Sequence, residues 1–141
     1  MSGCNGLQSR TALVTGAGSG IGAQIARHLA GMGAAVAVND LHEDRAETVA
    51  GEIETGGGRA LAVPFDITDY EAAAEGVHRV EQALGSVDIL VNNAGMPIVG
   101  FDWDVAFLDS RPEQWPPFVN LNLYGSLNCV HSVLPGMCRR G

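Results

Sequence analysis

A glycine-rich stretch near the amino terminus places the tightest limit on what this chain can fold into. Residues Thr15–Gly22 read TGAGSGIG and lie between a short apolar run and a segment with helical spacing of apolar residues. Glycines let the backbone turn sharply and approach a ligand closely, because they carry no Cβ. The N–H groups and positive dipole end of the following helix would point back at this turn. The stretch therefore predicts either a pyrophosphate site or only a tight strand-to-helix connection.

The rest of the chain alternates short apolar runs with longer helical patterns. We predict strands at Thr11–Thr15, Ala35–Asn39, Ala60–Pro64 and Val87–Val91, and helices at Ile21–Gly33, Glu43–Thr55 and Asp69–Leu84. The strands are almost entirely apolar, which is typical of parallel strands covered on both faces. The alternation predicts an α/β fold with right-handed crossovers, a Rossmann-type doubly wound parallel sheet. Thr68–Glu71 fits a capping box at the start of the third helix.

After the fourth predicted strand the pattern changes. Asn92–Gly95 indicates a turn, and an irregular loop follows from Met96 to Asp109. We expect a fourth helix capped by Ser110–Glu113, because Ser is a good N-cap and Pro is tolerated in a first turn. The segment Phe118–Leu134 is apolar over more than one stripe, which indicates deep burial or a subunit interface. No linker or repeat interrupts the chain, so we interpret residues 1–141 as a single domain.

Composition excludes several classes of function. The formal net charge of −8 disfavours nucleic acid as a partner, because phosphate binding needs a basic surface. Three cysteines and four histidines show no metal-ligand or disulfide spacing, so no metal site is predicted. The sequence contains no signal-peptide pattern and no apolar run of the ~18–20 residues that a membrane helix needs. We therefore expect a soluble cytoplasmic protein that does not bind a membrane.

Polar residues follow the other predicted strands at the same edge of the sheet. Asp40 ends the second strand, where a carboxylate hydrogen-bonds a ribose 2′-hydroxyl and repels the extra phosphate of NADP. NAD is therefore predicted over NADP, although a solvated loop aspartate is the alternative. Asp66 follows the third strand and would either accept a hydrogen bond from an adenine amino group or cap the third helix. The asparagines of Asn92–Gly95 would touch a cofactor or join strands to helices, and physical reasoning alone favours joining.

Together these motifs resemble the short-chain dehydrogenase/reductase family. The glycine stretch, Asp40, Asp66, Asn92–Gly95 and Trp115 with Asn122-Leu123-x-Gly125 occur in the family's order across essentially all 141 residues. The resemblance implies an oxidoreductase that transfers hydride between NAD and a secondary alcohol or ketone, with acyl thioesters or cyclic alcohols as substrates. The residues that it implies for the cofactor site are Thr15, Gly16, Gly18, Ser19, Gly20, Ile21, Gly22, Asp40, Asp66, Ile67, Asn92, Asn93, Ala94 and Gly95.

The resemblance also implies roles for three individual parts of the chain. Thr15 and Asn93 would tie neighbouring strands together. The main chain of Asn122 would hold a water and support a proton relay to the catalytic lysine. Aromatic residues of the loop that follows the fourth strand, Phe101, Trp103 and Phe107, would contact substrate.

The chain departs from the family in its catalytic residues. The family's serine on a fifth strand and its Tyr-x-x-x-Lys pair on a fifth helix have no counterpart, and all eight basic residues are arginine. Because proton transfer to an alcohol needs a group of tuned pKa, we predict that these 141 residues alone are inactive. We expect the partial dinucleotide-binding domain of a dehydrogenase that forms a homo-oligomer, with a sheet that stops after the fourth strand and fourth helix. The alternative is a non-catalytic dinucleotide-binding or partner-binding module, complete as written.

Overall fold

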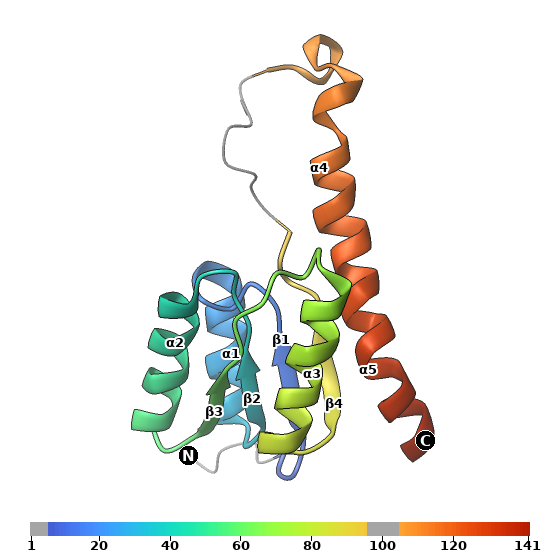
Figure 1. The fold of residues 1–141 in the computed structure, drawn as a ribbon. Helices are drawn as coiled ribbons and strands as arrows, with labels where there is room; N and C mark the ends of the chain where they lie inside the picture. Colours follow the sequence, from blue (N-terminus) through green and yellow to red (C-terminus); the bar gives the residue numbers. More distant parts are fainter. Residues whose placement is uncertain (1–5, 96–104) are drawn as a thin grey trace.

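A parallel four-stranded sheet forms the centre of the molecule (Figure 1). The computed structural model describes residues 6–95 and 105–141. The strands are β1 (Thr11–Val14), β2 (Ala35–Val38), β3 (Arg59–Ala62) and β4 (Val87–Val91), in the spatial order β3-β2-β1-β4. Each neighbouring pair is parallel, and the strand order reverses at β1, which lies between β2 and β4. The predicted Rossmann-type doubly wound sheet is confirmed.

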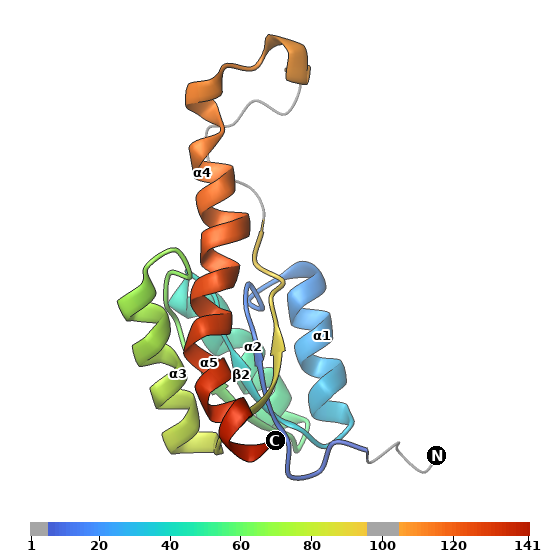
Figure 2. The same cartoon turned by 90° about the vertical axis from the view of Figure 1, so that its right-hand side faces the viewer.

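Helices cover both faces of this sheet, as Figure 2 shows from the side. Helices α1 (Gly20–Gly31) and α2 (Glu43–Thr55) pack on one face, where Val14, Val36 and Val38 join one buried cluster. Helices α3 (Tyr70–Leu84) and α5 (Ser126–Arg140) pack on the other face against Leu13 and Ala37. Successive strand residues point to opposite faces, so a sheet covered on both sides requires apolar residues at every position.

The capping box predicted for α3 is wrong by one residue. Asp69 is the N-cap, and its Oδ1 accepts a hydrogen bond from the backbone N–H of Ala72 at 3.1 Å. The hydroxyl of Thr68 instead donates to Oδ1 of Asp66 at 2.7 Å, and the same oxygen accepts the N–H of Thr68 at 2.8 Å. The Thr68 hydroxyl is used in this local Asx turn and therefore does not cap α3 as the pattern predicted.

The region after β4 differs from the single fourth helix that we expected. Two short 3-10 helices, η1 (Phe107–Asp109) and η2 (Pro112–Gln114), precede a helical run made of α4 (Pro116–Val119), the π-helical turn η3 (Asn120–Gly125) and α5. The upper part of this run projects beyond the sheet (Figures 1 and 2).

The cap predicted for that fourth helix is also wrong. The hydroxyl of Ser110 donates to the carbonyl of Phe107 at 2.7 Å and accepts the indole N–H of Trp115 at 3.0 Å. Arg111 takes the N-cap position of η2, and its backbone N–H donates to Oε1 of Gln114 at 2.7 Å. The serine side chain therefore bonds to the preceding turn, where the Phe107 carbonyl also accepts the Ser110 N–H at 3.1 Å.

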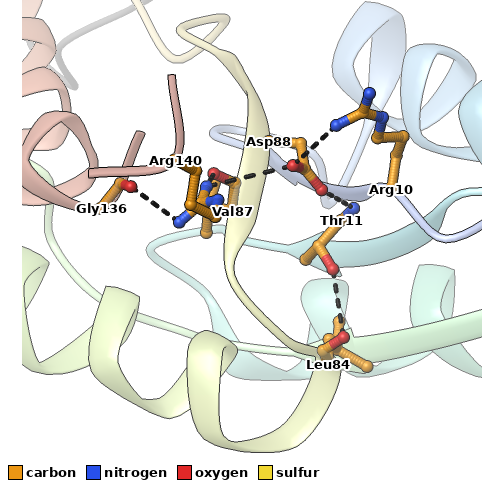
Figure 3. Close-up of polar contacts among 7 residues, drawn as sticks. All are labelled: Arg10, Thr11, Leu84, Val87, Asp88, Gly136 and Arg140. Carbon is orange, nitrogen blue, oxygen red and sulfur yellow. Dashed lines mark hydrogen bonds and ion pairs between the residues drawn. The ribbon is translucent and has the colours of Figure 1, made fainter. Parts of the chain in front are cut away.

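A polar clasp joins the sheet to the end of α5 at the edge opposite the glycine stretch (Figure 3). The register between β1 and β4 shifts beside Thr11, and Oδ2 of Asp88 accepts the Thr11 N–H at 2.9 Å. The guanidinium of Arg10 pairs with the other carboxylate oxygen at 3.1 Å. Arg140 donates to the carbonyl of Val87 at 2.6 Å. The clasp therefore fixes α5 against β4 at this end.

Two findings concern the described ranges as a whole. None of their helices is both long enough and apolar enough to cross a membrane. Residues 6–95 and 105–141 also contain no cluster of three or more histidine, cysteine, aspartate or glutamate side chains that would hold a metal ion.

Candidate functional site

The glycine stretch forms a tight turn between β1 and α1, packed against the end of β4. Gly16 has a φ of +62°, and a Cβ there would lie 2.9 Å from the Cα of Ala94. A Cβ on Gly22 would overlap the carbonyl oxygen of Gly16 and Nδ2 of Asn93. Only glycine fits at both positions, because the backbone of one element lies directly against the other.

The middle of the turn, unlike Gly16 and Gly22, is not packed against other atoms. Gly20 has a φ of +55°, and no atom lies within 4 Å of the position that its Cβ would take. The side chain of the N-cap residue Ser19 makes no capping hydrogen bond, and the first turn of α1 carries no acidic residue. Free N–H groups and the helix dipole therefore favour an anion here, so these residues fit the pyrophosphate of a dinucleotide.

Asp40 lies against this turn rather than in solvent. Its side chain is largely buried, with 8% of the residue exposed. Oδ2 accepts the N–H of Gly18 at 3.0 Å, and Oδ1 accepts the N–H of His42 at 3.0 Å. The alternative of a solvated loop aspartate is therefore wrong. A carboxylate oxygen accepts more than one hydrogen bond, so both oxygens retain capacity for a ribose hydroxyl.

Thr15 and Asn93 join the ends of β1 and β4. The hydroxyl of Thr15 accepts the N–H groups of Asn93 and Ala94, both at 3.1 Å, and donates to the carbonyl of Val91 at 3.3 Å. The Asn93 side chain donates to the carbonyls of Thr15 and Gly16 at 3.0 and 3.1 Å. These bonds hold the glycine turn on the sheet, which is the joining role that physical reasoning favoured for an asparagine here.

Asp66 and Ile67 follow β3 at the same edge. Asp66 is exposed and does not cap α3, since Asp69 does. Its carboxylate instead accepts the N–H and hydroxyl of Thr68, and a contact with an adenine stays a prediction. Ile67 is 4% exposed, and its main-chain oxygen accepts the side-chain N–H of Asn128 at 2.9 Å. Its side chain lies against the site of a Cβ on Gly125, at 2.7 Å, so it supports the helical run.

Asn92 joins the end of β4 to the first residue of α5, while Asn122 forms its hydrogen bonds within the helical run. Asn92 donates from its side chain to the carbonyl of Ser126 at 3.4 Å. The Asn122 side chain donates to the carbonyl of Phe118 at 2.9 Å, and its main-chain oxygen accepts the hydroxyl of Ser126 at 3.0 Å. A Cβ on Gly95 would lie 2.8 Å from Oδ1 of Asn122. The two asparagines therefore lie on facing segments, and π-helical turns are frequent at functional sites.

Two residues at this edge were missed by the sequence reasoning. The buried side chain of Asn39 donates to the carbonyls of Val63 and Phe65 at 3.1 and 3.0 Å, and so joins β2 to the segment after β3. Its position as a polar residue at the end of an apolar strand could have indicated this role. Arg45, in the first turn of α2, places its Cβ 2.6 Å from where a Cβ of Gly18 would lie. Its position five residues after Asp40 could have indicated that it lies near the glycine turn.

Other predicted features lie apart from this site. Cys129 is buried, and burial raises the pKa of its thiol to about 11. His131 is exposed and shares a hydrogen bond of 3.0 Å with the Tyr70 hydroxyl, so Cys129 and His131 face different ways on α5. Of the loop aromatics, Phe101 and Trp103 lie outside the described residues, and Phe107 stacks on the Trp115 ring.

The comparisons with known proteins agree with this geometry. A profile described as short chain dehydrogenase matches residues 10–141. An acetoacetyl-CoA reductase of Rhizobium meliloti is 42% identical over 133 residues, which are 94% of this chain and 52% of that protein. The chain thus spans about half the length of the curated relatives that it matches.

Solved structures show the same likeness. A gluconate 5-dehydrogenase of Burkholderia cenocepacia, in complex with NADP and tartrate, superposes with a TM-score of 0.85 at 33% identity, over 98% of this chain and 52% of that one. A protein of Haemophilus influenza described as a D-mannonate oxidoreductase, with bound NAD, gives a TM-score of 0.83 at 29% identity, over 93% and 51%. The chain belongs to the short-chain dehydrogenase family of oxidoreductases.

Proposed function

We propose that this chain is the NAD-binding part of an oxidoreductase that moves hydride between the nicotinamide and a secondary alcohol or ketone. The observation that carries the proposal is the open glycine turn, with Asp40 held against Gly18 by a hydrogen bond of 3.0 Å. When bound, the dinucleotide supplies the hydride chemistry. The chain's own residues bind its phosphates at the start of α1 and its adenosine ribose at Asp40.

The proposed site includes further residues at the same sheet edge. Asp66 would accept a hydrogen bond from the adenine, because its Oδ2 has no role in the turn that Oδ1 forms with Thr68. Gly16, Gly20 and Gly22 shape the turn, while Ser19 and the exposed Ile21 face the cofactor. Asn92–Gly95 closes the site beside β4. Asn122 takes a supporting part in proton transfer, through a main-chain oxygen that already accepts the Ser126 hydroxyl.

Isothermal titration calorimetry of the purified protein with NAD and NADP tests this proposal. We expect one dinucleotide per chain, with NAD bound more tightly than NADP, because the Asp40 carboxylate repels a 2′-phosphate. Asp40→Ala should weaken NAD binding and reduce the preference. Asp109→Ala, at an exposed carboxylate in η1, is the matched control and should change neither affinity. Failure of folded wild-type protein to bind either dinucleotide would refute the proposal.

A substrate class follows from the relatives rather than from the described residues. We propose an acyl thioester with a ketone or hydroxyl group, since one relative is an acetoacetyl-CoA reductase. The second candidate function is a non-catalytic dinucleotide-binding module, which would use the same glycine turn and Asp40. Reading the gene beyond Gly141 separates the two: a serine-bearing strand and a Tyr-x-x-x-Lys pair support the enzyme, and a stop codon supports the module.

We also propose that the protein self-associates through the helical run after β4. Five of its exposed apolar residues recur at spacings of four, four, three and four along one face: Val119, Leu123, Leu127, Val130 and Leu134. Such a continuous apolar stripe indicates a contact with another surface. A second copy would bury it lengthwise, and light scattering should show a dimer or larger that Leu123→Arg dissociates. A monodisperse wild-type monomer would refute this assignment.

We also propose that the protein is located in the cytoplasm.

A further inference from the structure

The helical run after β4 is uncharged over most of its length. Residues 115–138 contain no aspartate, glutamate, lysine or arginine, although the whole chain carries a net charge of −8. Copies of an acidic chain repel each other where their charged faces meet, so an uncharged face is where two copies approach most easily. The same run carries the exposed apolar stripe that begins at Val119 and ends at Leu134. Both features fit a second copy of this chain better than a partner that recognises charge.

One side chain of this uncharged run gains a positive charge close to neutral pH. His131 is the only histidine among residues 115–138, and histidine is the side chain that titrates between about pH 5 and 8. It is exposed on α5, four residues after Leu127 and three residues before Leu134. Side chains at these spacings are neighbours on the surface of a helix. The imidazole therefore flanks the apolar stripe.

Tyr70, at the start of α3, holds this imidazole in place. Its hydroxyl shares a hydrogen bond of 3.0 Å with Nδ1 of His131, and the two rings meet edge to face with their centroids 5.4 Å apart. A tyrosine hydroxyl donates to a neutral Nδ1 or accepts from a protonated one. The contact therefore positions the ring in either charge state and does not neutralise a proton on it.

No ion pair compensates a charge on His131 within residues 6–95 and 105–141. The three ion pairs of these ranges are formed by arginines with Asp88 or Glu52. The other titratable and charged groups on the elements packed beside this part of α5 are Asp66, Asp69, Glu71, Glu75, His78, Arg79, Glu81, Asp88 and Tyr124. A proton on His131 thus adds a charge that water solvates in a single copy. A contact along the stripe would remove that charge from water, which is unfavourable without a partner.

We propose that His131 makes the contact between two copies dependent on pH. The copies associate while the imidazole is neutral and separate when it gains a proton. This inference rests on the proposed self-association and adds its regulation. If each copy takes up one proton as the contact opens, the dissociation constant of the dimer rises by up to about a hundredfold per pH unit below the titration of the histidines.

The sign of this effect separates it from the general charge of the protein. Acidification reduces the net charge of −8, and so weakens the repulsion between copies and favours association. Protonation of His131 acts in the opposite direction. Association is therefore complete at about pH 8 and is lost as the pH falls through the range in which histidine titrates.

The test measures the dimer dissociation constant by sedimentation equilibrium at about pH 8 and about pH 5.5, with circular dichroism to confirm folding. We expect the constant of the wild-type protein to be at least about tenfold higher at the lower pH. His131→Gln should remove this rise. His28→Gln is the matched control, because His28 is exposed on α1 at the other face of the sheet, and it should keep the wild-type response.

A third variant tests the charge without a change of pH. Arginine is charged at every physiological pH, so His131→Arg should raise the dissociation constant at about pH 8 by at least about tenfold. A wild-type dimer that is equally tight or tighter at about pH 5.5, or a His131→Arg dimer as tight as the wild type, would overturn the role of His131 and leave the contact intact. A wild-type monomer at about pH 8 would instead overturn the contact itself, and the inference with it.

Discussion

The closest packing in the glycine turn makes Gly22→Ala the sharpest test of how that turn is built. The added methyl group would overlap the carbonyl oxygen of Gly16 and the side-chain amide of Asn93. The amide donates to two carbonyls, at 3.0 and 3.1 Å, so moving it weakens both bonds. Overpacking costs ~1–3 kcal/mol, and each hydrogen bond contributes ~1 kcal/mol.

Alanine also gains helix propensity over glycine, by about 1 kcal/mol, because Gly22 lies in α1. We therefore expect Gly22→Ala to lower the free energy of unfolding by about 2–3 kcal/mol and to weaken dinucleotide binding. Gly51→Ala is the matched control: Gly51 lies in α2, and no atom comes within 4 Å of its Cβ position. This control should stabilise the protein by up to ~1 kcal/mol.

Urea unfolding followed by circular dichroism measures both changes, and calorimetry with NAD measures the effect on binding. The opposite signs of the two glycine-to-alanine changes are the informative result. Equal stabilisation by both substitutions, with NAD affinity unchanged, would refute the close packing of the turn against the end of β4.

Three other predictions concern the framework that holds the site. Thr15→Val should cost ~1–2 kcal/mol in urea unfolding, because it removes the hydroxyl that accepts two partly buried N–H groups, whereas Thr15→Ser should cost less than ~1 kcal/mol. Asp69→Ala should cost ~1 kcal/mol through loss of the α3 cap, while Asp69→Asn retains most of it; equal losses would contradict the cap. Iodoacetamide should label exposed Cys138 in the native protein and spare Cys129 until unfolding, as peptide mass spectrometry would show. Since burial raises the pKa of Cys129 from 9.0 to about 11, its contribution to stability is full below pH 9 and is lost as the pH rises towards 11.

The sheet and its first three helices could be predicted because local pattern and global fold agree there. Apolar runs covered on both faces leave little choice for strands such as Ala35–Val38, and glycines end α2 at Thr55. The observed strand ends differ from the predicted ones by one or two residues, because Asn39 and Pro64 lie beyond the last paired residues of β2 and β3. The glycine turn and Asp40 were predictable for the same reason: the order of a strand, a turn and a helix places both at one sheet edge.

The missed features depend on contacts between residues that compete for the same partner. Thr68 lost its cap position because Asp66, two residues earlier, accepts both its N–H and its hydroxyl. Ser110 likewise does not cap the following helix, because its hydroxyl donates to the carbonyl of Phe107. Neither competition is visible in a capping pattern, which treats each residue alone. The π-helical turn at Asn122 and the proximity of Arg45 to Gly18 likewise arise only when separate elements pack together.

Backbone amide NMR of the protein during titration with NAD tests the central claim most directly. The account predicts that the amide signals of Gly18, Gly20 and Ile21, with those around Asp40, shift first and saturate together, while signals near the Asp88 clasp remain unchanged. A folded spectrum that stays unchanged at millimolar NAD, or shifts confined to other parts of the sheet, would contradict a dinucleotide site at this turn.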